Sequence, residues 1–214
     1  MRTLTARIVG ELLHHEGLVR EAYRDSCGVW TWSVGITDAS GHRVGRYRDN
    51  PQSVERCLEL FVWLLETRYL PAVLAAFGGF EPAEHQLAGA LSFHWNTGAL
   101  PRAAWLKRFL AGDPRAREAM LDWRRPPEIL PRRRKERDLF FEGRWAGDGT
   151  ALLYDVAKPS YRPCKPRRMD VAPWLAKLLE GPAEPLAEIP GTPAPPCLSD
   201  GTARHGSWFD RLFH

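Results

Sequence analysis

The sequence EGLVREAYRDSCGVWTWSVGIT, residues 16–37, decides the fold. Apolar residues recur at helical spacing before it, at Leu4, Ile8 and Leu12. Gly17 suits the left-handed backbone position just past the end of a helix. We therefore expect Glu16 to end a helix, where the helix dipole disfavours a negative charge. A carboxyl group in that place suits a general acid, which must carry a proton.

A β-hairpin is predicted immediately after this helix. Residues 22–24 and 29–34 are rich in strand-forming side chains, and residues 25–28 read as a turn in which Gly28 can adopt a positive φ. Asp25 would then lie hydrated and ionised at the start of the hairpin. Thr31 would project from the second strand on the same side of a cleft.

Two carboxyl groups with opposite protonation demands, together with a hydroxyl that can hold a water, suit glycoside hydrolysis. Asp25 follows Glu16 by nine residues, and Thr31 follows Asp25 by six. Spacing alone leaves an alternative open, because a helix-end glutamate and a turn aspartate are common without any catalytic role.

The order of short motifs in residues 16–37 resembles the N-terminal motif of the phage-type lysozymes, the endolysins of glycoside hydrolase family 24. These motifs are Glu-Gly, Ala-Tyr-x-Asp, Gly-Val-Trp-Thr and Gly-x-Thr. LSFHWNTGA, residues 91–99, is similar to the family's Ser-Phe-x-x-Asn-x-Gly segment. RRRKERDLF, residues 132–140, is similar to its Arg-Arg-x-x-Glu-Arg-x-Leu helix. The resemblance covers roughly residues 4–145.

This resemblance implies an α+β, lysozyme-like fold, with an active-site cleft between a small N-terminal β lobe and a larger helical lobe. It implies a muramidase that hydrolyses the β-1,4 bond between N-acetylmuramic acid and N-acetylglucosamine in peptidoglycan. Glu16 matches the general acid, while Asp25 and Thr31 match the groups that activate and position water. Tyr23 and Asn96 match substrate-binding positions.

The sequence departs from the family pattern in two places. The family often has Thr-Ile-Gly-Tyr-Gly-His-Thr where residues 31–37 read TWSVGIT, so its tyrosine and histidine are missing. No arginine aligns firmly with the one that pairs with the acid in some members, and Arg137 and Arg144 are the nearest candidates. We expect the arginines of residues 131–142 to face water, and Leu139 and Phe140 to pack inward.

Composition limits the remaining functions. The chain has 214 residues and a net charge of +4, and residues 101–144 carry thirteen Lys or Arg against seven Asp or Glu. This basic segment suits either an anionic partner such as peptidoglycan or a solvated helix face. No nucleic-acid-binding motif accompanies it, which makes DNA or RNA a poorer fit. Four cysteines form no C-x-x-C pair, so we expect free thiols, no metal and no cofactor.

Localisation follows from the absence of two signals. No apolar run approaches the ~18 residues of a membrane-spanning helix, and no secretory signal precedes the first helix. We expect a monomer that is made in the host cytoplasm. It would need an agent such as a holin to reach the periplasm or cell wall.

The remaining helices are predicted from residues that start or end helices and from the spacing of apolar residues. A helix is expected to start at Asn50 and Pro51 and to join the lobes, after residues 36–47 finish the small sheet. A short helix is expected at residues 71–77, and Pro82 should open a buried central helix. Two further helices should start at Pro101 and Pro114, followed by the arginine-rich one.

The chain is predicted to divide at residue 145 into a phage-type lysozyme domain, residues 1–145, and a Pro-rich extension, residues 146–214, with short amphipathic helices. Residues 174–179 and 208–213 are apolar islands that either dock back on the lysozyme body or bind a partner such as a phage-like particle. Two alternatives to hydrolysis stay open. A lytic transglycosylase would use Glu16 alone, and a wall-binding protein would be anchored by its tail.

Overall fold

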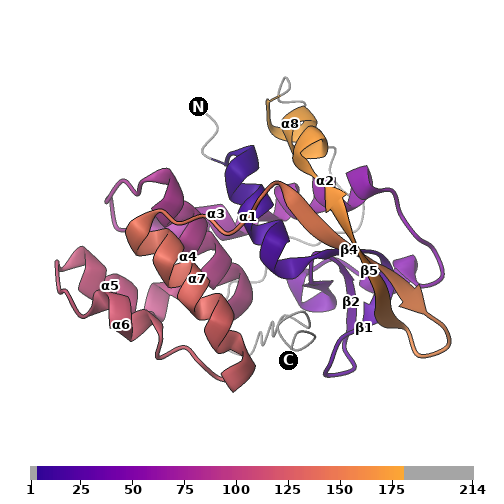
Figure 1. The fold of residues 1–214 in the computed structure, drawn as a ribbon, viewed down its shortest axis with the longest axis horizontal. Coiled ribbons are helices and arrows are strands. Elements are labelled where there is room, and N and C mark those ends of the chain that lie inside the picture. Colours follow the sequence, from indigo (N-terminus) through magenta and orange to yellow (C-terminus); the bar gives the residue numbers. More distant parts are fainter. Residues whose placement is uncertain (1–3, 181–214) are drawn as a thin grey trace.

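The computed structural model describes residues 4–180, which form a mixed α+β fold and confirm the predicted class. A five-stranded sheet lies at one end and a group of helices at the other, with α1 between them (Figure 1). The helices of eight or more residues are α1 (Ala6–Glu16), α2 (Val54–Leu64), α4 (Glu84–Thr97), α7 (Leu130–Glu142) and α8 (Ala172–Glu180). The shorter ones are α3 (Leu70–Ala76), α5 (Ala104–Leu110) and α6 (Ala116–Met120).

Helix α1 forms as its apolar spacing predicts. The Thr5 hydroxyl caps its start by accepting a hydrogen bond from the Ile8 amide at 3.2 Å. Its end is Glu16, because Gly17 adopts a φ of 65° and donates its amide to the Leu13 carbonyl at 2.9 Å. Its apolar face is buried, including Ile8 and Leu13.

The strands are β1 (Leu18–Arg24), β2 (Trp30–Ser33), β3 (Ile36–Thr37), β4 (Thr150–Ala157) and β5 (Arg162–Asp170). Their order in the sheet is β3-β2-β1-β4-β5. The predicted hairpin is present as the antiparallel pair β1 and β2, in which Tyr23 lies opposite Thr31. On its other side β1 pairs in parallel with β4, with Leu18 opposite Leu153.

Strands β4 and β5 were not predicted from the sequence. Residues 150–170 form an antiparallel hairpin that continues the sheet next to β1. The division of the chain into domains at residue 145 stays a prediction. Residues 150–170, which follow that boundary, hydrogen-bond to the β lobe through β1.

Two predicted boundaries in the β lobe are wrong. Residues 36–47 were expected to finish the sheet, but only Ile36–Thr37 are strand, and the rest contains two 3₁₀ turns, Asp38–Ser40 and Val44–Tyr47. The Asp38 side chain accepts a hydrogen bond from the Val44 amide at 2.8 Å, so this amide has a partner without a neighbouring strand. Helix α2 starts at Val54, capped by Ser53, and not at Asn50 and Pro51.

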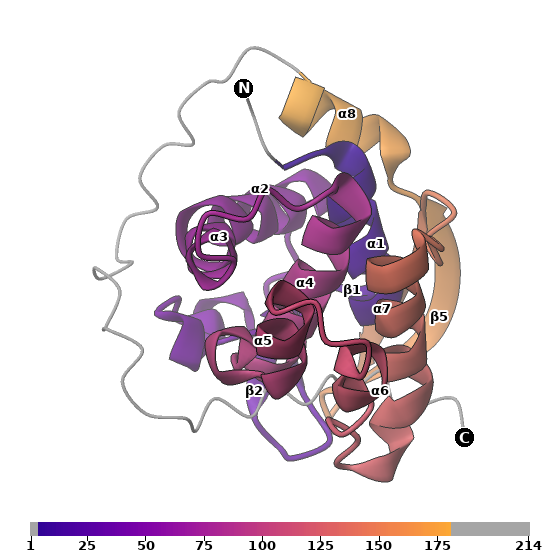
Figure 2. The ribbon, with the colours of Figure 1, turned by 90° about the vertical axis from the view of Figure 1, so that its left-hand side faces the viewer.

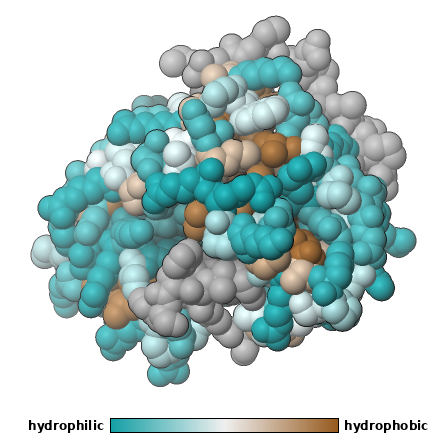
Figure 3. Space-filling view, turned by 45° about the vertical axis from the view of Figure 1, so that its right-hand side comes forward, coloured by the Kyte–Doolittle hydropathy of each residue, from teal (hydrophilic) through white to brown (hydrophobic). Residues whose placement is uncertain are grey.

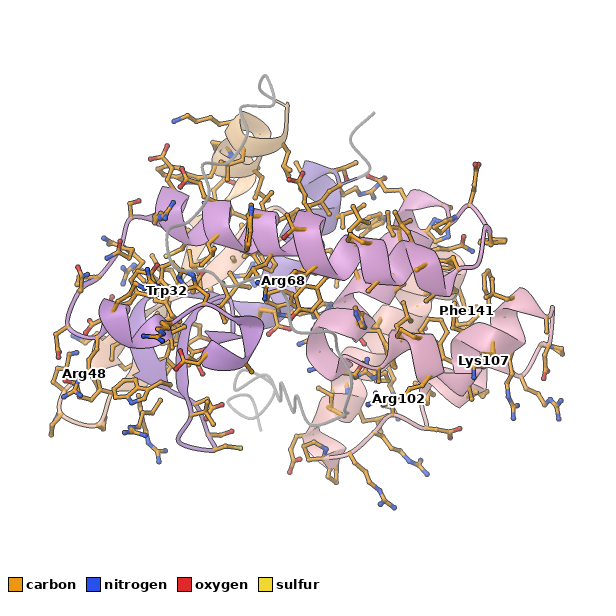
Figure 4. The ribbon with its side chains drawn as sticks, turned by 180° about the vertical axis from the view of Figure 1, so that it is seen from behind. Trp32, Arg48, Arg68, Arg102, Lys107 and Phe141 are labelled. Atoms are coloured by element: carbon orange, nitrogen blue, oxygen red, sulfur yellow. The ribbon has the colours of Figure 1, made fainter. Side chains whose placement is uncertain are left out.

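One long helix connects the two lobes. Helix α2 runs through a π-helical turn, Leu65–Tyr69, directly into α3, so the short helix predicted at residues 71–77 is the end of this longer one. Pro71 has no amide hydrogen to donate to the preceding turn, and the wider turn lies just before it. In Figure 4 this helix crosses the molecule, and Arg68 marks the middle of it.

Helix α4 is the buried centre of the helical lobe, as predicted, and Figure 2 shows it surrounded by the other helices. Helix α7 packs closely against it at Gly89. A Cβ at Gly89 would lie 3.0 Å from the Phe140 Cβ and 3.2 Å from the Glu136 carbonyl oxygen. Trp105 and Met120 of α5 and α6 are buried beside them, also as predicted.

The first predicted apolar island is α8, and it docks on the body of the protein. Leu175 and Leu179 are buried, and a Cβ on Gly10 of α1 would lie 3.7 Å from Leu175 Cδ1. Lys177 of α8 pairs with Glu55 of α2 at 2.7 Å. The second island, residues 208–213, and the Pro-rich residues 190–196 lie outside the described residues.

The surface is mainly hydrophilic on the face seen in Figure 3, with small hydrophobic areas between polar side chains. Within residues 4–180, every helix is too short or too polar to cross a membrane.

A buried carboxylate holds the segment before β4 against α1. Glu11 is 1% exposed, and its side chain accepts the amides of Ala146, at 3.1 Å, and Gly147, at 2.7 Å. Its Oε1 also lies 3.3 Å from His15 Nε2. Burial acts to raise the pKa of Glu11, but His15 and these amides outweigh it and lower the pKa from its ordinary value of 4.5. The ionised carboxylate is therefore the form that the fold stabilises.

We expect Glu11→Gln to lower the free energy of unfolding by about 1–3 kcal/mol at pH 7, because the charged acceptor is lost. A lowered folded-state pKa stabilises the fold above the unfolded-state value, and this contribution is lost as the pH falls through the folded-state value. The gap between wild type and variant in urea unfolding should therefore narrow below about pH 4.5.

The matched control is Glu55→Gln, which breaks the exposed ion pair to Lys177 and should cost less than about 1 kcal/mol. A gap that stays constant from pH 7 to pH 3 would contradict the role given to the Glu11 carboxylate.

Candidate active site

Glu16 is buried and paired with a cation. It is 2% exposed, and its Oε1 lies 2.5 Å from Nη1 of Arg132, which is 3% exposed. A buried carboxylate without a partner would be costly, so this ion pair fixes the side chain of the candidate acid. It also fixes the position of α1 relative to α7.

Arg132 belongs to a larger buried network. Its Nε donates to Glu136 Oε1 at 2.9 Å, and the Ser92 hydroxyl donates to the same oxygen at 2.7 Å. Arg133 pairs with the other oxygen of Glu136 and donates to Asn96 Oδ1 at 2.7 Å. Burial acts to raise the pKa of Glu136, but Arg133 and Arg132 outweigh it and lower the pKa. The carboxyl groups of Glu16 and Glu136 thus pair with two guanidinium groups inside the helical lobe.

The prediction that the arginines of this helix face water is wrong for Arg132 and Arg133, which are buried. Arg132, and not Arg137 or Arg144, pairs with Glu16. Arg137 pairs with Asp138, and Arg144 pairs with Glu142 near the surface.

A spacing signal for this network was present in the sequence. Arg132 and Glu136 are four residues apart, as are Ser92 and Asn96. On two helices that face each other, such spacing presents both members of each pair on one side. Leu139 and Phe140 pack inward as predicted.

Asp25 lies in the predicted turn. Its Oδ1 accepts the amides of Cys27 at 2.9 Å and Val29 at 2.8 Å. Gly28 has the expected positive φ, 78°. Within the described part of the chain, Oδ2 accepts no hydrogen bond, and the residue is half-buried. Backbone amides thus hold one carboxylate oxygen and leave the other available to a water.

Thr31 and Tyr23 form a cross-strand pair under the turn. Thr31 is 3% exposed, and its hydroxyl donates to the Val29 carbonyl at 3.2 Å. Tyr23 is 1% exposed. Burial raises the pKa of Tyr23 well above 10, and the charges of Glu16 and Asp25 raise it further, so both carboxyl groups act on the same phenol. Tyr23 is therefore placed as a buried residue that lies within electrostatic range of both carboxyl groups.

Two aromatic residues from the helical lobe approach Glu16. A Cβ on Gly35, in the turn after β2, would lie 3.7 Å from Glu16 Oε2 and 3.9 Å from Trp95 Nε1. Tyr69 packs on Trp95 with ring centroids 4.5 Å apart. Burial raises the pKa of Tyr69 to about 12, against a lowering by Arg68, and Glu16 adds to the rise. Neither aromatic residue was among the predicted site residues.

Other predicted residues have structural places. Asn96 is 8% exposed and engaged with Arg133. His94 is a buried core histidine, as predicted, because its Nδ1 accepts the Leu100 amide at 3.4 Å. Burial, and then Arg102, lower the pKa of His94 to about 4. Val34 and Ile36, which stand where the family has tyrosine and histidine, are buried in the core.

The described residues contain no cluster of three or more His, Cys, Asp or Glu that could hold a metal ion. Cys27, Cys57 and Cys164 are free thiols, and Cys197 lies outside the described residues.

We expect Glu136→Gln to lower the free energy of unfolding by about 3–5 kcal/mol, because it leaves buried arginine charge uncompensated. Urea unfolding at pH 7 measures this loss. Glu118→Gln is the matched control, since Glu118 is 72% exposed and lies 3.9 Å from Arg137. It should cost less than about 1 kcal/mol. Equal stabilities of the two variants would contradict the network's role.

Phage lysozymes and endolysins resemble this chain in sequence or in structure. A sequence model of the phage lysozyme family matches residues 13–137. The endolysin from Escherichia coli O157:H7 phage FAHEc1 is similar in structure, with a TM-score of 0.55 and 21% identity, over 68% of this chain and 96% of the endolysin. A point mutant of P22 lysozyme has a TM-score of 0.52 and 25% identity, over 65% of this chain and 99% of its own. No curated protein sequence matches significantly. The predicted lysozyme-like fold is confirmed.

Proposed function

The chain belongs to the phage lysozyme family, and we propose that it hydrolyses the β-1,4 bond between N-acetylmuramic acid and N-acetylglucosamine in bacterial peptidoglycan. Membership makes it a glycoside hydrolase of the lysozyme class. The bond that it cuts and the residues that act on it are the proposal.

The observation that carries the proposal is the asymmetric environment of Glu16. Arg132 holds Oε1 at 2.5 Å, whereas Oε2 lies beside Gly35, and Trp95 Nε1 lies near the same glycine. In the proposed mechanism Oε2 carries the proton and donates it to the glycosidic oxygen as the bond breaks. Arg132 then stabilises the carboxylate that remains, since its guanidinium is already in place and needs no reorganisation.

Asp25 and Thr31 supply the second half of the mechanism. In this proposal two backbone amides hold Asp25 Oδ1, and Oδ2 acts as the base that accepts a proton from water. Thr31 donates its own hydrogen to the Val29 carbonyl, so its hydroxyl oxygen can accept from the same water and orient it. A carboxylate in the hairpin turn and a hydroxyl on the strand that follows it thus activate and position the nucleophile.

The proposal also covers where the enzyme acts and which polymer it binds. A lysozyme-class enzyme acts on the cell wall, and we propose peptidoglycan as its substrate. Basic side chains of residues 101–144 would favour the anionic groups of that polymer, although Arg132 and Arg133 are committed to the core. A holin-dependent route from the cytoplasm, and a partner for residues 146–214, stay predictions.

Glu16→Gln should reduce peptidoglycan hydrolysis by about a hundredfold to ten-thousandfold, the range for loss of general acid catalysis. Gln keeps the side-chain shape, and Arg132 keeps its bond to Glu136, so the protein should still fold. Release of reducing ends from purified peptidoglycan measures the rate, and thermal unfolding measures the fold. Glu81→Gln, an exposed carboxylate on the helical lobe, is the control. Hydrolysis by Glu16→Gln at the wild-type rate would rule out this acid.

Asp25→Asn should reduce the rate by about a hundredfold or more, since the amide cannot take a proton from water. Its oxygen can still accept the two backbone amides, so the turn is retained. Asp170→Asn is the matched control, because Asp170 also accepts a backbone amide, from Ala172 at 2.9 Å.

Mass spectrometry of the products separates hydrolysis from transglycosylation. Hydrolysis adds one water across the cut bond, whereas a lytic transglycosylase leaves an anhydro sugar that lacks this water. An anhydro product from the wild-type enzyme, with no effect of Asp25→Asn, would replace the proposed hydrolase with the transglycosylase alternative.

A further inference from the structure

The tip of the β4–β5 hairpin contacts β1 and β2, the two strands that flank the turn containing Asp25. Tyr161, in the turn between β4 and β5, accepts the amide of Arg24 on its carbonyl oxygen at 2.7 Å. Its ring meets the Trp30 ring edge-on, with centroids 5.1 Å apart. Arg24 immediately precedes Asp25, and Trp30 immediately precedes Thr31. One residue therefore contacts the chain neighbour of each candidate water-binding group.

Tyr161 is itself held in place by charged neighbours. Its hydroxyl donates to Asp49 Oδ2 at 2.8 Å, and Arg48 Nε donates to that hydroxyl at 3.3 Å. Lys158 lies 4.0 Å from the centre of the Tyr161 ring and pairs with Asp49 at 2.6 Å. Figure 4 shows Arg48 at the outer end of the β lobe. These contacts join the hairpin turn to the loop after the second 3₁₀ turn.

The base of the hairpin is also fixed to the segment that carries the acid. Leu153 pairs with Leu18, two residues after Glu16, and the Glu11 carboxylate holds the amides of Ala146 and Gly147. The hairpin thus spans β1 from the Glu16 end to the Asp25 end. The hairpin therefore contacts β1 near both of its ends, through Leu153 at Leu18 and through Tyr161 at Arg24. The family match ends at residue 137, before this hairpin begins.

We propose that Tyr161 is a positioning residue that holds Asp25 and Thr31 in the geometry needed to activate water for the reaction proposed above. The inference rests on that proposed function. Tyr161 acts through Arg24 and Trp30 and does not touch the reacting atoms. A displacement of about 1 Å at such a site can reduce the rate about a hundredfold without a large change in substrate binding.

The test uses the full-length chain with Tyr161→Asn and Tyr161→Phe. Tyr161 has a φ of 54°, a conformation that asparagine tolerates well, so Tyr161→Asn removes the ring while keeping the turn. We expect kcat on peptidoglycan to fall about tenfold or more, with KM changed less than about twofold. Tyr161→Phe keeps the ring against Trp30 and should restore kcat to within about threefold of wild type.

A correction for folded protein and two control variants accompany these assays. Rates are expressed per folded molecule from unfolding curves at the assay temperature. Tyr161→Gly, which also removes the ring and tolerates the positive φ, replaces Tyr161→Asn if the latter does not fold. Arg167→Gln breaks the exposed pair to Asp155 on the same hairpin, away from Arg24 and Trp30, and should keep the wild-type kcat. Glu16→Gln sets the floor of the assay.

The outcomes separate the two proposals. A wild-type kcat in Tyr161→Asn, or an equal loss in Tyr161→Phe, would overturn the positioning role while leaving the proposed hydrolase intact. Loss of activity only in proportion to lost folded protein would also overturn it. Failure of the wild-type enzyme to cleave peptidoglycan would overturn the proposed function and this inference together.

Discussion

The structure depends on keeping one carboxylate buried beside a fixed cation. Glu16 ends the first helix, and the guanidinium that compensates it comes from Arg132, in a helix far along the chain. That guanidinium is shared with Glu136, so the charge on the acid is balanced only when α1, α4 and α7 have all packed together. Burial would otherwise cost several kcal/mol per ion, and this cost couples the assembly of the helical lobe to the state of the candidate acid.

The β lobe meets a different requirement, which is to hold a carboxyl group near water. Asp25 is kept by two backbone amides in a tight turn, and within the described residues no cationic side chain hydrogen-bonds to it. The two carboxyl groups therefore have contrasting surroundings, one enclosed by arginines and aromatic rings and the other in a half-buried turn. The proposed division of labour between an acid and a base would need such a contrast.

Much of this was readable in the sequence, and the exceptions have physical reasons. The helix that ends at Gly17, the turn at Asp25 and the buried α4 follow from local spacing and turn chemistry. Arg132 and Arg133 were expected at the surface because a run of basic residues usually is, and only the facing Ser92 and Asn96 reveal their burial. Residues 162–170 carry two prolines and five basic or acidic residues, which conceals a strand. As an edge strand, β5 tolerates them. Its antiparallel neighbour β4 pairs in parallel with β1, through a contact that no local pattern encodes.

The parallel pairing of β1 with β4 has a consequence for how the enzyme is made. Leu18 leaves the ribosome early, whereas Leu153 emerges only after the whole helical lobe has been synthesised. Until then one edge of β1 lacks its hydrogen-bonding neighbour, and contacts of such long sequence separation form late. A nascent or prematurely terminated chain would therefore contain the candidate site residues without β4, the strand that pairs with β1. In an enzyme of the lysozyme class, synthesis of the chain through β4 would thus have to precede a complete β lobe.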